Sequence, residues 1–338
     1  MKKKIRLIAA ALILVALISA IIYAYNTVFS AYDGAETRIY IPAGSDADAI
    51  ADTLGLHTDR GFAARVMMLY NLRGGKPDKA RGSYVVTPGT RAWSMASRLI
   101  TGRQTPVRIT FNNIRTLDVL AARISARMAF DADSFMVACN DTLPALGYAS
   151  GPEFPAAFLP DTYEFYWTDS APRVIATLVS YTDKFWSAER LGKAKALGLS
   201  PTEVATVASI VEEETAKADE RPKVARLYLN RLDKGMKLQA DPTVKFALGD
   251  FTLRRIYGSM LQVSSEYNTY VVDGLPPGPI RIPDRSTIDA VLNAPHHDYL
   301  YMCARADFSG YHDFAVDYDT HISNARRYRA ALDKRNIR

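Results

Sequence analysis

An apolar run without charged residues near the amino terminus constrains this chain most. Four basic residues among the first six precede an uncharged segment at 7–32. Its most apolar part, residues 7–25, has about the 20 residues that a helix needs to cross a bilayer. We therefore predict a transmembrane helix at 7–28 with a cytoplasmic tail at 1–6, which leaves the rest of the chain on the periplasmic or extracellular side of the cell (inner) membrane. A cleaved signal peptide is the alternative, but the run is long for one and no small-residue cleavage site ends it before Tyr23.

Charge and cysteine content say little about the kind of protein. The net charge of the 338 residues is +6, and four of these charges precede the apolar run, so the remainder carries only +2. This charge is no argument for binding nucleic acid, and we predict none. Cys139 and Cys303 are the only cysteines, and a disulfide between them is permitted outside the cytoplasm but not decided by the sequence. The five histidines lack metal-ligand spacing, so we predict no metal and no other cofactor.

Short strand, turn and helix patterns follow the apolar run. They recur at residues 38–54, 84–100 and 107–126, and such small units favour an α+β fold over a long parallel sheet. A small β-α domain close to the membrane is predicted at 37–104, and a larger, helix-rich domain at 107–336. Helices of the larger domain are expected at residues 131–139, 173–191, 201–216, 220–234, 286–293 and 321–334, and further strands at 163–167, 270–272 and 299–304.

One predicted helix carries a carboxylate on its apolar side. Ser200 and Glu203 have the spacing of a capping box, and Pro201 suits the first helical position, so a helix is expected to begin there. The apolar residues that follow share one stripe at about 100° per residue, and they are Val204, Val207, Ala208 and Val211. Glu214 lies about 60° from the last of these, at the edge of the stripe.

The three consecutive glutamates of this helix are therefore not equivalent. Glu213 lies about 160° from Val211 and is expected to face water, while Glu212 lies about 100° away, on the border. A carboxylic acid on the buried side of a helix is costly, so we expect Glu214 to have a chemical role or a partner. The alternative for this segment is a solvated acidic helix end.

Polar and aromatic residues suited to a carbohydrate cleft follow Glu214. Amides can bond to ring hydroxyls and acetamido groups, and aromatic rings can stack on the apolar face of a sugar. The candidates are Asn230, Gln239, Asp241, Thr243, Tyr267 and Asn268, followed by Thr269 and Tyr270. Each has a structural alternative, since Asn268 could cap a turn, Asp241 could cap the segment that Pro242 begins, and the tyrosines could belong to a core. Their crowding around one apolar-face glutamate favours chemistry on a glycan.

Several motifs match one known family in the same order. They are F-L-P-D-T-Y from Phe158, S-I-V-E-E-E-T from Ser209, N-R-L from Asn230, G-M-K-L-Q-A-D-P-T-V from Gly235, Y-N-T-Y from Tyr267, G-L-P-P-G-P-I from Gly274, and the pair His312 and His321. Over nearly its whole length the chain resembles the YceG-like family, the MltG endolytic murein transglycosylases. It departs from the family at Ser265-Glu266, before Y-N-T-Y, and at Ile282-Pro283-Asp284, after the proline-rich loop, so the rim of the cleft can differ.

The resemblance implies a fold and a reaction. The fold is a transmembrane helix, a small LysM-like domain at 37–104 and a YceG-like catalytic domain at 107–336. The reaction is cleavage of the β-1,4 bond between N-acetylmuramic acid and N-acetylglucosamine within nascent peptidoglycan strands. It leaves 1,6-anhydro-N-acetylmuramic acid ends without consuming water, and would terminate strand elongation. Peptidoglycan synthases of the elongation complex are implied as partners.

The resemblance also implies roles for two of the glutamates. The catalytic glutamate of the family stands directly before threonine, which here is Glu214, the residue that the periodicity selects. Glu212 matches the other glutamate of the motif and is assigned to substrate binding. Two other functions stay open. A hydrolase in which Asp241 activates water would leave reducing ends, and a wall-binding scaffold without activity would lose nothing when Glu214 is replaced by Gln.

Overall fold

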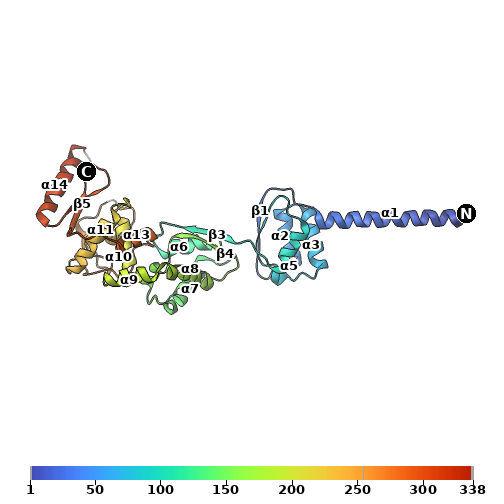
Figure 1. Cartoon of the computed structure of the whole chain (residues 1–338), viewed down its shortest axis with the longest axis horizontal. Coiled ribbons are helices and arrows are strands. Elements are labelled where there is room, and N and C mark those ends of the chain that lie inside the picture. Colours follow the sequence, from blue (N-terminus) through green and yellow to red (C-terminus); the bar gives the residue numbers. More distant parts are fainter. Residues whose placement is uncertain (1, 254, 336–338) are drawn as a thin grey trace. The chain divides into compact units, whose positions relative to one another are not determined.

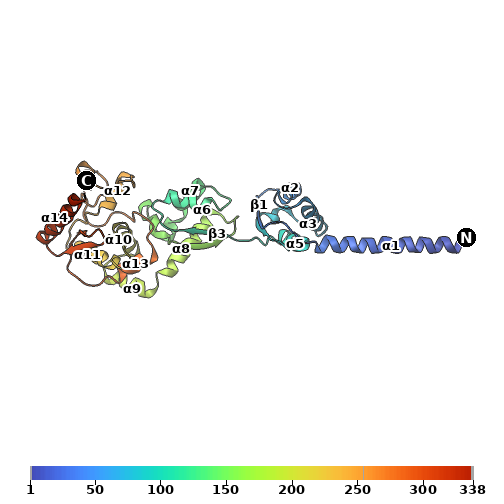
Figure 2. The ribbon, with the colours of Figure 1, turned by 90° about the horizontal axis from the view of Figure 1, so that it is seen from above.

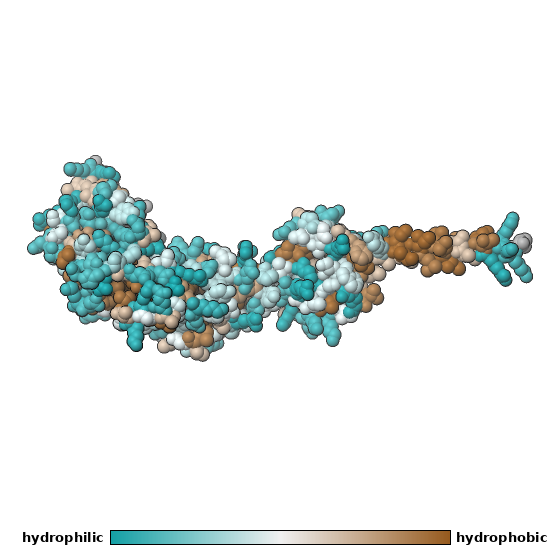
Figure 3. Space-filling model, viewed as in Figure 1, coloured by the Kyte–Doolittle hydropathy of each residue, from teal (hydrophilic) through white to brown (hydrophobic). Residues whose placement is uncertain are grey.

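The computed structural model describes residues 2–253 and 255–335. Met1, in the predicted cytoplasmic tail, and residue 336, at the end of the predicted catalytic domain, lie outside the described residues. A single helix, α1 (Lys2–Phe29), begins the described chain (Figure 1) and includes the basic residues that we expected to form a tail. It is long and apolar enough to cross a membrane. Figure 3 shows the apolar surface along this helix and the hydrophilic side chains at its tip.

Two compact units make up the described chain. The first contains the residues up to Ile109 together with 127–129 and 164–169, and the second contains the remainder. The boundary falls within β3 (Val107–Phe111) and β4 (Asp161–Phe165), which pair in a two-stranded sheet. Helices combined with small two-stranded sheets confirm the predicted mixture of helix and sheet.

The first unit is built around an antiparallel pair of strands. In this pair Ile39 lies opposite Tyr84, and both side chains are fully buried. Two helices between the strands begin at aspartates, because Asp46 and Asp59 accept hydrogen bonds from backbone N–H groups of the first turn. The elements are β1 (Thr37–Ile41), α2 (Ala47–His57), α3 (Arg60–Leu72), α4 (Pro77–Ala80), β2 (Gly82–Val86) and α5 (Ala92–Thr101).

The second unit surrounds one buried helix, α10 (Pro201–Glu214). Residues 204–212 of this helix are all buried, and Figure 2 shows it among α9, α11 and α13, against which it packs. The helices of this unit are α6 (Leu117–Ser125), α7 (Ala132–Thr142), α8 (Ala171–Phe185), α9 (Ala188–Ala196), α10, α11 (Arg221–Asp233), α12 (Asp241–Leu248), α13 (Arg285–Leu292) and α14 (Tyr318–Lys334), with 3-10 turns at η1 (Pro144–Leu146), η2 (Gly151–Ala157) and η3 (Gly258–Gln262). Strands β5 (Tyr301–Ala304) and β6 (His312–Ala315) pair antiparallel, and α14 packs on them.

Some predicted elements are wrong, and each has a local reason. The helix expected at 173–191 is two helices, because α8 ends at Phe185 and the side chain of Ser187 caps a new helix, α9. Residues 270–272 form turns and not a strand, since the N–H of Tyr270 donates to Asn268 Oδ1. The sequence did not predict helices α3, α4 and α12 or strand β6. Strand β4 is shifted towards the amino terminus from the expected 163–167, and β5 is shorter than the expected 299–304.

Candidate active site

Three of the four glutamates of helix α10 lie at its carboxyl end. The capping box is present, because the N–H of Ser200 donates to Glu203 Oε2 at 2.7 Å and the N–H of Glu203 donates to Ser200 Oγ at 3.2 Å. The last helical residue is Glu214, and Thr215 leaves the helix with an extended backbone (φ −137°, ψ 131°). The helix predicted at 201–216 is therefore confirmed, two residues shorter at its carboxyl end.

Glu214 lines a polar cavity of about 290 Å³, which we call the Glu214 cavity. Tyr228 Oη donates a hydrogen bond of 2.7 Å to Glu214 Oε1. On a neighbouring wall, Tyr270 Oη donates one of 2.7 Å to Asp241 Oδ1. Other residues that line the cavity are Leu227, Arg231, Leu238, Gln239, Cys303 and His312. Two carboxylates, each of which accepts a hydrogen bond from a tyrosine hydroxyl, therefore line the same cavity.

The pKa of Glu214 is raised from its ordinary value of 4.5 to about 7. Burial is the largest cause, because a carboxylate loses hydration there, and the negative charge of Asp241 acts in the same direction. The hydrogen bond from Tyr228 and the interactions with His312 and Lys245 lower the pKa. Glu214 can therefore hold a proton near neutral pH and also release it, which general acid–base catalysis requires.

The backbone beside Glu214 is fixed by hydrogen bonds. Gln239 has a φ of 50°, in the left-handed region that few residues other than glycine adopt. Its N–H donates to Thr269 O at 3.0 Å. The guanidinium of Arg231 donates to Leu238 O at 2.7 Å. These contacts hold the segment that brings Gln239 and Asp241 to the cavity wall.

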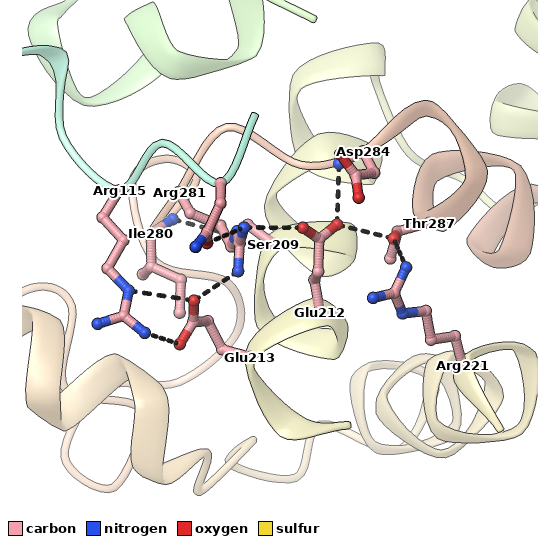
Figure 4. A network of polar contacts seen from close by, with 10 residues as sticks. Arg115, Ser209, Glu212, Glu213, Arg221, Ile280, Arg281, Asp284 and Thr287 are labelled. Carbon is pink, nitrogen blue, oxygen red and sulfur yellow. Dashed lines mark hydrogen bonds and ion pairs between the residues drawn. The ribbon is translucent and has the colours of Figure 1, made fainter. Parts of the chain in front are cut away.

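Figure 4 shows Glu212 and Glu213, the two glutamates that precede Glu214, in a network of ion pairs. Arg281 Nη1 lies 2.7 Å from Glu213 Oε1, and its Nη2 lies 3.0 Å from Glu212 Oε1. Arg115 makes a further ion pair of 3.0 Å with Glu213. The prediction that Glu213 faces water is therefore wrong, since its side chain is only 16% exposed. The helical periodicity predicted that this side of α10 faces water. In the structure, Arg115 and Arg281 from other segments cover it.

Glu212 lies outside the Glu214 cavity. Its Oε2 accepts hydrogen bonds from the N–H of Asp284 at 2.8 Å and from Thr287 Oγ1 at 2.7 Å, and its side chain is 3% exposed. With its other oxygen on Arg281, both carboxylate oxygens are engaged within the protein. Glu212 therefore anchors the end of α10 and does not line the cavity, and its assignment to substrate binding stays a prediction.

The proline-rich loop before Arg281 packs closely against its surroundings. A Cβ atom added to Gly278 would lie 1.8 Å from Pro152 O, so glycine is required there. The N–H of Ile280 donates to Ser209 Oγ on α10 at 3.0 Å. This loop therefore fixes the position of Arg281 relative to the glutamates with which it pairs.

The two asparagines predicted for the site direct their side-chain amides towards backbone carbonyl groups. Asn230 Nδ2 donates to His297 O at 2.6 Å. Asn268 is fully buried, and its Nδ2 donates to Val263 O at 2.8 Å. Neither residue lines the Glu214 cavity, so both stabilise the loops around it.

Thr243 and Tyr267 also support the site from behind. Thr243 is fully buried, and its hydroxyl shares a hydrogen bond of 2.9 Å with the hydroxyl of Thr269. The ring of Tyr267 packs on Phe246, with 4.6 Å between centroids. Of the residues predicted for the site, the cavity thus brings together Glu214, Gln239 and Asp241.

Cysteines and metal ligands can be placed as well. Cys139 is buried in α7, and Cys303 lies in β5 at the cavity wall; both are free thiols. Burial raises the pKa of Cys139 to about 12, so this thiol is unreactive. In the described part of the chain, no group of three or more His, Cys, Asp or Glu side chains could hold a metal ion.

Comparison with known proteins places this site in a family. A model of the YceG-like family matches residues 39–327. The chain belongs to the YceG-like family. A crystal structure of a putative YceG-like protein from Listeria monocytogenes has a TM-score of 0.56 and 26% sequence identity, and the match covers 85% of this chain and 98% of that one.

Two curated relatives share part of the YceG-like sequence. The endolytic murein transglycosylase of Bacillus subtilis (strain 168) is 36% identical over 149 residues, which are 44% of this chain and 41% of that protein. The protein of the same name from Streptococcus pneumoniae (serotype 2, strain D39) is 28% identical over 168 residues, 48% of this chain and 30% of its own. The matched segments span less than half of either relative.

Tyr228 and His312 line the Glu214 cavity but were not among the predicted site residues, and Tyr270 was named in the sequence analysis without a role. Tyr228 is an aromatic residue on a helix face, which resembles a core residue. Tyr270 and His312 stand in motifs that match the family, and this was the signal that could have selected them. Their proximity to Glu214 follows only when α11 and β6 pack beside the end of α10.

Proposed function

We propose that this chain is a membrane-anchored endolytic peptidoglycan transglycosylase. It cleaves the β-1,4 bond between N-acetylmuramic acid and N-acetylglucosamine within nascent strands and leaves 1,6-anhydro-N-acetylmuramic acid ends. The observation that carries this proposal is Glu214, held in a polar cavity with a pKa of about 7. The names of the Bacillus subtilis and Streptococcus pneumoniae relatives support it.

The proposed reaction needs one acid at the glycosidic oxygen. Protonated Glu214 donates to that oxygen, and the departing muramic acid ring develops oxocarbenium character. The C6 hydroxyl of the same ring attacks C1, and its effective concentration is high because it is intramolecular. The proton of this hydroxyl must leave as the new bond forms, and the Glu214 carboxylate is one acceptor for it. The proposed substrate contacts are Gln239 and Asp241. The segments that form the cavity wall are held in place by four residues outside the cavity, Asn230, Thr243, Tyr267 and Asn268.

The proposal extends to the rest of the chain. Helix α1 anchors the protein with its amino terminus in the cytoplasm, an orientation that the basic residues at 2–6 favour. The part at 37–104 is LysM-like, which the antiparallel strands β1 and β2, with helices α2, α3 and α4 between them, support. The part at 107–336 carries the catalytic site, although residue 336 lies outside the described chain. Synthases of the elongation complex are the proposed protein partners.

Mass spectrometry of the products tests this function. The full-length protein in detergent micelles is incubated with uncrosslinked glycan strands, beside Glu214→Gln and the matched control Glu189→Gln, whose side chain on α9 is 74% exposed. Anhydro-muramic ends from the wild type and the control, but not from Glu214→Gln, are expected. Substantial anhydro product from Glu214→Gln would mean that another residue is the acid. No cleavage by the wild type would contradict the activity.

A hydrolase is the second candidate, because Asp241 faces the same cavity as Glu214. In that reaction Asp241 would activate a water molecule, and the product would end in a reducing sugar. Tyr270 donates a hydrogen bond to Asp241 Oδ1. This oxygen is therefore already engaged, which argues against Asp241 as the base that activates water. Reducing ends, with one oxygen taken from the solvent, would favour the hydrolase and would make Asp241→Asn the next variant to test.

A further inference from the structure

A buried carboxylate that the proposed reaction does not use holds His312 in place. Glu220 precedes α11, and its side chain is 5% exposed. Its Oε1 accepts a hydrogen bond of 2.8 Å from the N–H of His312, and its Oε2 lies 2.8 Å from His312 Nδ1. Because a carboxylate only accepts, Nδ1 carries a hydrogen in this contact. In the neutral imidazole the lone pair is then on Nε2.

The same carboxylate also binds the residue that follows Glu214. Thr215 Oγ1 donates to Glu220 Oε2 at 3.0 Å, and Thr215 is buried. One side chain therefore ties together the end of α10 and the first residue of β6, His312.

The imidazole faces the cavity that holds Glu214. His312 lines this cavity and its side chain is 15% exposed, and a positive charge on it would lower the pKa of Glu214. Ionisable groups from every neighbouring element surround it. Those that line the cavity are Glu214 on α10, Tyr228 and Arg231 on α11, Asp241 on α12, Tyr270 in the turn and Cys303 on β5. Glu220 lies just before α11, and Tyr311 with its contacts Lys217 and Asp219 lies in the loops beside β6.

We propose that His312, oriented by Glu220, is a second catalytic residue of the proposed transglycosylase, and that its Nε2 accepts the proton of the attacking C6 hydroxyl. This role rests on the proposed function. Glu220 is a positioning residue, because it acts through His312. With Glu214 alone, one carboxyl group must give up a proton and take up another within one turnover. Two groups that face one cavity can donate one proton and accept the other in the same step.

The proposed step is balanced without any further reagent. The bond from C1 to the leaving oxygen breaks while the bond from the C6 oxygen to C1 forms. The leaving oxygen takes the proton of Glu214, and the proton of the C6 hydroxyl passes to His312 Nε2. The products are the 1,6-anhydro sugar, a free 4-hydroxyl, a carboxylate and an imidazolium. Return of one proton from the imidazolium to the carboxylate restores the enzyme.

The pH dependence of kcat/KM distinguishes one catalytic group from two. Full-length protein and uncrosslinked glycan strands are used between pH 5 and 9. If two groups act, kcat/KM should fall on both sides of an optimum, on the alkaline side as Glu214 loses its proton and on the acid side because a general base must be unprotonated. His312→Gln should lower kcat/KM about 100-fold or more and abolish the acid-side fall. Glu220→Gln should lower it about 10-fold or more.

A matched control and a structural readout complete the test. His296→Gln removes an exposed imidazole of the same unit and should leave the profile unchanged. If His312→Gln keeps the wild-type rate and profile while anhydro ends still form, the role of His312 is wrong and the proposed function stands. Absence of anhydro ends from the wild type overturns both. Independently of activity and of variant folding, nitrogen NMR of the wild type should show a lone pair on His312 Nε2, and a hydrogen on Nε2 instead would overturn the proposal.

Discussion

Tyr228 Oη lies 2.7 Å from Glu214 Oε1 and donates a hydrogen bond to it. The two residues come from consecutive helices, α10 and α11, that pack against each other. Burial raises the pKa of Glu214, and this bond lowers it, because it stabilises the carboxylate. The pKa of about 7 therefore reflects a balance between burial and the hydrogen bond from Tyr228. Substitutions can change the two effects separately.

Tyr228→Phe should move the pKa of Glu214 upwards. A hydrogen bond to a charged group contributes about 1.5–3 kcal/mol, so its loss should raise the pKa by roughly one unit or more. The alkaline limb of kcat/KM should then shift to higher pH by the same amount. Tyr318→Phe, which removes an exposed hydroxyl on α14, should leave the limb where it is. A limb that stays put or moves to lower pH in Tyr228→Phe would contradict the balance.

Glu214→Gln should stabilise the fold, and more so at alkaline pH. With a folded pKa of about 7 and an ordinary value of 4.5, the unfolded chain releases the proton first as the pH rises. Stability conferred by Glu214 therefore falls between pH 4.5 and 7 and stays low above, by at most about 3 kcal/mol. Urea unfolding at pH 4.5 and pH 8 measures the difference between the variant and the wild type. An advantage of Glu214→Gln that does not grow with pH would refute the raised pKa.

Arg281→Ala should destabilise the second unit strongly. It leaves Glu212 buried without its ionic partner and Glu213 with Arg115 alone, and loss of one member of a buried ion pair costs about 3–5 kcal/mol. Arg305→Ala is the matched control, because its pair with Asp307 is exposed on both sides and should contribute under about 1 kcal/mol. Chemical denaturation of both variants provides the comparison. Equal, small losses would show that the network in Figure 4 does not hold the end of α10.

Two glycine substitutions should have opposite signs. Gly278→Ala places a Cβ atom 1.8 Å from a backbone carbonyl, and the shift that this forces should cost about 1–3 kcal/mol or more. Gly192→Ala lies inside α9 with nothing within 4 Å, and should gain about 0.5–1 kcal/mol from helix propensity. Thermal unfolding of the two variants measures both effects. A neutral Gly278→Ala would mean that the proline-rich loop can move away from Pro152.

Part of the site could be predicted because its signals are local. The capping box at Ser200 and the apolar spacing after it predicted where this helix begins and put Glu214 at the edge of its apolar stripe, and the structure has this start and a buried helix that ends at Glu214. Gln239 and Asp241 followed from motifs a short distance along the chain. Asn230 and Asn268 carried the same polar chemistry, but their side chains bind backbone carbonyl groups, and no sequence pattern tells these two uses of an amide apart.

The sequence by itself determined the apolar helix α1, the start of α10 and the choice of Glu214, because helix caps and apolar periodicity act over a few residues. Only the tertiary structure decided which groups surround that acid. Tyr228 tunes its pKa, and Arg281 removes its neighbour Glu213 from water. His312 reaches the same cavity from a strand about 100 residues further along the chain. Burial and charge pairing depend on what packs against a helix face, and that information is spread over segments whose contact no local pattern encodes.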